Sequence, residues 1–119
     1  MSLDKYKLPL CMVDGVEFAL DDAPEVKVTV RMPIQANKKF SFGWARRLPI
    51  KDGVLEASPF DVVAAQKVEF FETQIVKIEG VDKPETFWKD YPLALEEIWE
   101  KVQAALPEYQ DQLEEEAKN

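Results

Sequence analysis

The sequence contains no histidine, one cysteine and four glycines in 119 residues. Without histidine there can be no Ser–His or Cys–His nucleophilic pair, and no zinc or iron site that needs imidazole ligands. Cys11 alone cannot form an internal disulfide or a thiolate cluster, a usage typical of a reducing compartment. The glycines are scattered along the chain, so no glycine-rich phosphate loop is present.

Long apolar runs are also missing. No stretch approaches the ~20 apolar residues of a membrane helix, and residues 1–10 lack the apolar core and cleavage site of a signal peptide. Paired carboxylates occur at Asp21/Asp22 and Glu96/Glu97, but adjacent residues point in different directions and do not converge on one substrate. We therefore expect a cytoplasmic protein that is not an enzyme, has no cofactor and does not bind a membrane.

Charge is distributed unevenly in this chain of net charge −8. Residues 1–57 have a net charge of +1, residues 58–81 of −2, and residues 82–119 of −7, with eleven carboxylates against four cations. The acidic last third disfavours nucleic acid as a partner, because phosphates attract cations. It is interpreted either as a solvated helical tail or as an electrostatic face for a basic partner.

The first half of the sequence predicts short strands. Strict alternation of apolar and polar residues predicts a half-buried strand over residues 25–32. Asp14-Gly15 between two apolar runs predicts a hairpin within residues 8–20. Asp52-Gly53 predicts a second turn, followed by an extended piece at residues 54–57. Residues 40–45 are interpreted as another strand or as an extended aromatic arm.

The second half predicts helices. A long helix is predicted over residues 59–79. Ser58 is its N-cap, Pro59 occupies its first position and Gly80 is its C-cap. Its apolar stripe consists of Phe60, Val63, Ala64, Val68, Phe71, Ile75 and Ile78, of which Phe71 and Ile75 are predicted to be core. Because Val62, Phe70 and Val76 lie off the stripe, the helix is apolar on more than one side and is expected to need cover from both a sheet and a second helix. A helical turn at residues 85–89 precedes a second helix, which is capped by Asp90 and opened by Pro92. The apolar face of that helix consists of Leu95, Ile98, Trp99, Val102 and Leu106.

Pro107 is predicted to stop or kink the second helix, and residues 107–119 to add a short terminal one. The predicted fold class is α+β, with a small N-terminal antiparallel sheet packed against a long central helix and one or two C-terminal helices. The length indicates one domain over residues 1–119, with a sheet-forming part at about 1–57 and a helical part at about 58–117.

Aromatic residues and cations alternate between Lys38 and Arg47. Such a pattern can stack bases and neutralise phosphates, but the net charge of −8 favours core aromatics with solvated cations at the ends. A third interpretation is an exposed patch that binds protein. Trp88, in a segment rich in helix breakers, is expected to be partly exposed. The candidate protein-binding surface consists of Phe40, Phe42, Trp44 and Trp88.

The second half of the chain also resembles a known family. An apolar helix runs into Ile78-Glu79-Gly80-Val81, a polar linker with Phe87 and Trp88 follows, Tyr91-Pro92 introduces the next helix, and the chain ends at Lys118-Asn119. This order is similar to that of the tail assembly chaperones of long-tailed bacteriophages, whose N-terminal strand and following Phe-containing stretch are also similar. One departure is that Lys77-Ile78 stands where the family often has tryptophan.

The resemblance implies a small protein of the host cytoplasm that binds the phage tape measure protein. It also implies binding to tail tube subunits and absence from the finished virion. A homo-oligomer is a further expectation, because large apolar patches are unusual on monomers. Two alternatives remain open from the sequence: a structural head–tail connector or tail component, and a small nucleic-acid-binding or regulatory protein that uses residues 38–47.

Overall fold

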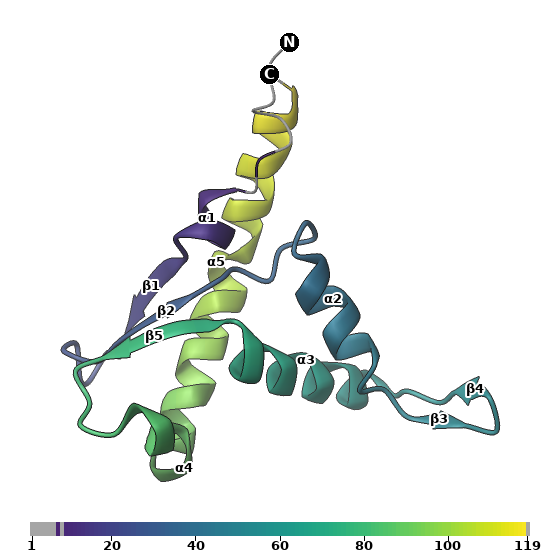
Figure 1. The fold of residues 1–119 in the computed structure, drawn as a ribbon, viewed down its shortest axis with the longest axis horizontal. Helices are drawn as coiled ribbons and strands as arrows, with labels where there is room; N and C mark the ends of the chain where they lie inside the picture. Colours follow the sequence, from purple (N-terminus) through teal and green to yellow (C-terminus); the bar gives the residue numbers. More distant parts are fainter. Residues whose placement is uncertain (1–6, 8, 119) are drawn as a thin grey trace.

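The computed structural model describes residue 7 and residues 9–118, apart from the side chains of residues 111–118. As predicted, the fold is α+β, and its sheet is small and antiparallel (Figure 1). The sheet has the order β1-β2-β5, formed by Val16–Ala19, Lys27–Val30 and Ile75–Glu79. The predicted strand at residues 25–32 is confirmed around β2, the central strand, where alternate side chains from Val26 to Met32 are buried.

Helix α5, Pro92–Lys118, provides much of the core. Its predicted apolar face is confirmed, because Ile98, Trp99 and Val102 are buried against side chains of β2 and Phe70. The helix continues through Pro107, so the predicted stop is wrong. Pro107 is exposed at the surface, and the carbonyl left without its usual donor can therefore bind water.

The predicted hairpin at Asp14-Gly15 is also wrong. Residues Leu10–Val13 form the short helix α1, and the N–H groups of both Asp14 and Gly15 donate to the Leu10 carbonyl. Only Gly15 has a positive φ, of 83°, whereas a type I′ turn needs two such residues. Asp14-Gly15 therefore closes a helical turn, as glycine commonly does at a helix C-terminus.

The predicted central helix is shorter than expected. Helix α3 spans Pro59–Thr73, and residues Ile75–Glu79 form the edge strand β5. Here β-branched side chains favour a strand, and β2 offers backbone groups along its second edge. Gly80, predicted as the helix C-cap, follows this strand with φ 82°. An added Cβ there would lie 2.0 Å from the carbonyl oxygen of Glu25, so glycine permits a close approach between two chain segments.

Residues 38–45 are helical, contrary to the predicted strand or extended arm. They form α2, Lys38–Ala45, which is capped by the Asn37 side chain and packs along α3 (Figure 1). After α2, the strands β3, Ile50–Lys51, and β4, Val54–Leu55, make a separate hairpin around the predicted Asp52-Gly53 turn. A 3-10 turn at Pro84–Thr86 and the short helix α4, Phe87–Asp90, match the predicted turn before α5.

Candidate protein-binding surface

The four residues selected from the sequence do not form one surface. Phe40 is 5% exposed and belongs to the core, where its ring meets that of Phe70 edge-on at 6.5 Å. Trp44 is half-buried against the same core. Trp88 lies on α4 against Phe71, with ring centroids 5.4 Å apart, far from α2 in the fold (Figure 1). Of the four, only Phe42 is mainly exposed, at 61%.

Buried polar side chains fix α2 against the end of α3. The Asn37 amide nitrogen donates to the side-chain oxygen of Gln74 at 2.8 Å and to the Met32 carbonyl at 3.2 Å. The Asn37 side-chain oxygen accepts from the N–H of Phe40. Because each of these buried groups has a partner, Asn37 can cap α2 within the core without leaving a polar group unpaired.

A second joint lies near the other end of α2. The Arg47 guanidinium donates to Glu69 at 2.7 Å and also to Glu72, and these two hydrogen bonds raise the pKa of Arg47 above its ordinary value. Gly43 allows the close contact, because a Cβ added there would lie 2.1 Å from the Glu69 side-chain oxygen. The interactions hold α2 against one side of α3, whereas Phe60, Val63 and Val68 elsewhere on α3 remain exposed.

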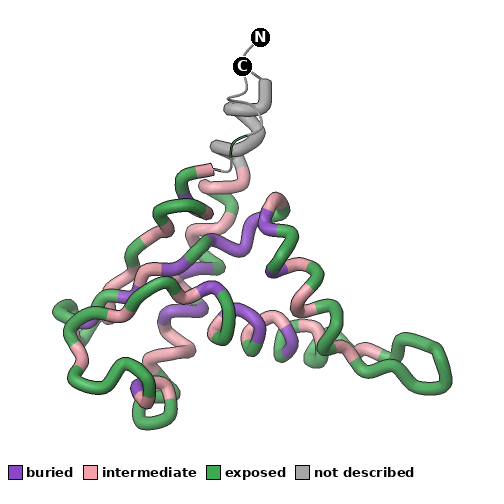
Figure 2. Tube along the Cα trace, viewed as in Figure 1, coloured by how far each residue is buried: buried purple, intermediate pink, exposed green. Residues whose placement is uncertain are grey.

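Several large apolar side chains of α3 are exposed. Phe60 is 87% exposed, and Val63 and Val68 are also exposed. The hairpin just before α3 continues this character, because Ile50, Val54 and Leu55 are all exposed (Figure 2). We call these six residues the apolar outer surface, although the hairpin contributes them from both of its faces: Ile50 and Leu55 pair on one face, and Val54 pairs with Lys51 on the other. Its members are Ile50, Val54, Leu55, Phe60, Val63 and Val68.

The hairpin of β3 and β4 forms an arm that projects from the rest of the molecule (Figure 1). Ile50 pairs with Leu55 and Lys51 with Val54, and the turn residues Asp52 and Gly53 have φ values of 54° and 76°. Two positive φ values are the signature of a type I′ turn. A two-stranded hairpin alone is at best marginally stable in water, so the arm gains most from a surface that covers it.

Sequence reasoning expected the helix to be covered on its apolar sides by a sheet and a second helix, and this is wrong for Phe60, Val63, Ala64 and Val68, which are exposed. The buried residues of α3 are Ala65, Glu69 and Phe70, on the side that faces α2 and the sheet. Phe71 and Ile75, predicted as core, are half-buried and pack against it. A signal was present, since Phe70 and Val62 fall off the predicted stripe and make the helix apolar on more than one side.

Other kinds of site find little support in the described part of the chain. No three His, Cys, Asp or Glu side chains gather there as a metal site. None of the described helices has the length and apolar character of a membrane span. No protein-family model, no curated protein and no solved structure matches this chain.

Proposed function

We propose that this protein is a tail assembly chaperone, which binds an apolar helical client and keeps it soluble during phage tail assembly. The proposed client is the tape measure protein, with tail tube subunits as further clients, and the proposed place of action is the host cytoplasm. The observation that carries the proposal is the apolar outer surface. The resemblance of Tyr91-Pro92 and the neighbouring segments to this family supports it independently.

The physical argument rests on how much apolar side chain stays in water. Exposed apolar side chains that gather on neighbouring elements of a soluble domain often mark a binding site. Covering a fully exposed Phe or Leu contributes about 1.5–3 kcal/mol. Phe60, Ile50 and Val54 are each at least 60% exposed, so a covering client gains appreciable free energy. An apolar face of a client helix laid across α3 and the arm would provide such a cover.

The test is co-expression of the tape measure protein from the same phage with this chain. We expect wild type to keep the client in the supernatant and Phe60→Ser with Val63→Ser to lose that ability. Leu93→Ser is the matched control, because Leu93 is 82% exposed but lies on α5, outside the apolar outer surface. Circular dichroism first checks that each variant is folded.

Three outcomes would argue against the proposal. If the wild-type protein leaves the client as insoluble as before, the protein is not a chaperone for this client. If the Leu93→Ser control and the Phe60→Ser, Val63→Ser variant lose client solubility equally, the client does not bind at the apolar outer surface. A purified virion that contains the protein would favour the head–tail connector alternative.

A further inference from the structure

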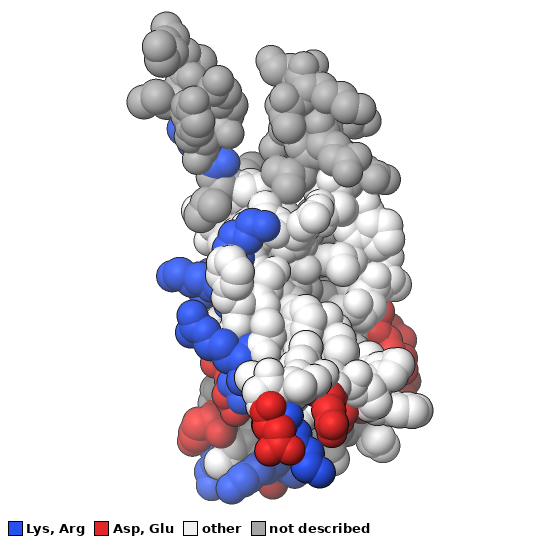
Figure 3. Space-filling model, turned by 90° about the vertical axis from the view of Figure 1, so that its right-hand side faces the viewer, with Lys and Arg blue, Asp and Glu red and all other residues white. Residues whose placement is uncertain are grey.

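Cations concentrate in one segment of this acidic chain. Residues 31–51 contain six Lys and Arg and no carboxylate, although the whole chain has a net charge of −8. Arg47 is held by Glu69 and Glu72. Lys38, Lys39 and Arg46 are exposed and make no ion pair with any residue that the structure describes. Figure 3, which faces α2 and the arm, shows Lys and Arg gathered along one edge beside a wide uncharged area.

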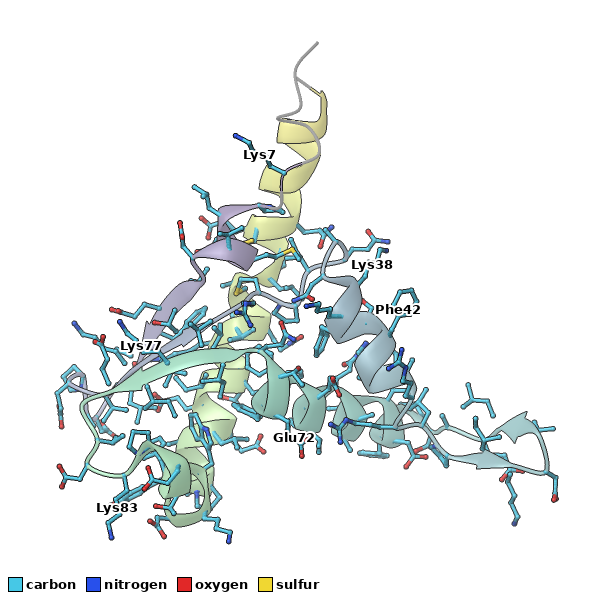
Figure 4. The ribbon with its side chains drawn as sticks, viewed as in Figure 1. Lys7, Lys38, Phe42, Glu72, Lys77 and Lys83 are labelled. Atoms are coloured by element: carbon cyan, nitrogen blue, oxygen red, sulfur yellow. The ribbon has the colours of Figure 1, made fainter. Side chains whose placement is uncertain are left out.

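Two of these cations form a stripe along α2. Lys38, Phe42 and Arg46 follow one another at four-residue spacing, with 61% exposed Phe42 between the charges. Rows at this spacing are the ridges by which helices pack together. Lys38 and Phe42 lie on the side of α2 turned away from α5 (Figure 4). We call Lys38, Phe42 and Arg46 the cationic stripe.

Helix α5 carries the complementary stripe. Glu100, Ala104 and Glu108 follow one another at the same four-residue spacing, and all three are exposed. Glu100 and Glu108 make no ion pair within the described residues. Both stripes therefore place two like charges ~12 Å apart along a helix axis, at a rise of ~1.5 Å per residue. In one stripe an aromatic ring separates the charges, and in the other a small alanine does. We call Glu100, Ala104 and Glu108 the acidic stripe.

We propose that the cationic stripe of one copy binds the acidic stripe of a second copy. Opposite charges would then meet at both ends, and Phe42 would lie over Ala104 between them. The contact cannot form within one chain, because Lys38 and Phe42 face away from α5. It joins two different surfaces, so it either closes into a ring or a reciprocal dimer, or it continues as an open assembly.

A second copy fits the cationic stripe better than nucleic acid does. The rest of the chain is acidic and repels phosphates, whereas the acidic stripe supplies carboxylates at the matching spacing. The two stripes lie outside the apolar outer surface, and the proposed self-association does not depend on the proposed client.

The experiment is sedimentation equilibrium of the full chain without a client, at low and high salt. We expect wild type to self-associate at low salt and to dissociate at high salt, because exposed charge pairs are screened. Lys38→Glu with Arg46→Glu, and separately Glu100→Lys with Glu108→Lys, should each weaken self-association by ~10-fold or more, since like charges then meet. Circular dichroism checks the fold of every variant.

The decisive variant combines all four changes. It has the net charge of the wild type but exchanges the signs of the two stripes, so we expect self-association to return. Lys83→Glu with Lys89→Glu is the matched control for the first pair, because both lysines are exposed. Lys83 (Figure 4) and Lys89, which belongs to α4 (Figure 1), lie far from α2. Three results would overturn the proposal: a monomeric wild type at low salt, a four-residue variant no stronger than the two-residue ones, or a control that weakens self-association equally. One result would assign the cationic stripe to nucleic acid instead. In that case the wild type is monomeric and binds a single-stranded oligonucleotide, and the variant with Lys38→Glu and Arg46→Glu no longer binds it.

Discussion

Truncation of Phe70 to alanine should be among the most damaging changes to this fold. The Phe70 side chain is fully buried, and its ring centroid lies 5.1 Å from that of Phe71 and 5.5 Å from that of Trp99. Loss of a fully buried Phe removes about 1.5–3 kcal/mol of burial free energy. The cavity left behind adds to this, which brings the expected loss to about 3–5 kcal/mol.

Urea unfolding followed by tryptophan fluorescence measures this loss, because Trp99 contacts Phe70 directly. The matched control is Phe60→Ala, which makes the same chemical change on the same helix at a residue 87% exposed. Phe60→Ala should change the free energy of unfolding by no more than about 0.5 kcal/mol. If the two variants unfold within about 1 kcal/mol of each other, the assignment of the two sides of α3 is incorrect.

Two further predictions concern the joint between α2 and α3 and the edge of the sheet. Gly43→Ala should not give the gain of about 1 kcal/mol that this change usually gives inside a helix, because its Cβ displaces Glu69 from Arg47. A full gain of that size in urea unfolding would contradict the close contact. The hydrogen bond from Lys77 lowers the pKa of Glu79. The pair therefore stabilises the folded state above the ordinary carboxyl pKa of 4.5, and this stabilisation is lost as the pH falls through the lowered value. Lys77→Gln should therefore raise the Glu79 pKa in an NMR titration, and an unmoved pKa would exclude the pair.

Local sequence was enough where neighbouring residues alone fix the backbone. Ser58 and Asp61 form the reciprocal hydrogen bonds of a capping box, so the start of α3 was predictable. Asp52-Gly53 adopts two positive φ values and makes the predicted turn. The alternation across β2 and the apolar face of α5 were also predicted, because each is the regular period of a single element against one core.

The ends and identities of other elements depended on tertiary contacts. Ile75–Glu79 continues the helical apolar period, yet it forms a strand because β2 has an open edge at that point. Residues 40–45 alternate as a strand does, yet they are helical, and Asn37 caps the helix while it is buried against Gln74. The strand partner of residues 75–79 is distant in sequence, so a local pattern contains no information about it, whereas the Asn37 cap is a local signal that the alternation outweighed in the prediction.

The candidate surface was hidden from the sequence for the same reason. Periodicity identifies the apolar sides of α3 but does not say which of them another element covers. The contacts of Gly43 and Arg47 with Glu69 place α2 on one side, and this leaves Phe60 and Val63 in water. Composition and local pattern therefore determined the fold class, one strand, one turn and the helix start, whereas tertiary packing decided which apolar residues form the core and which remain free to bind a partner.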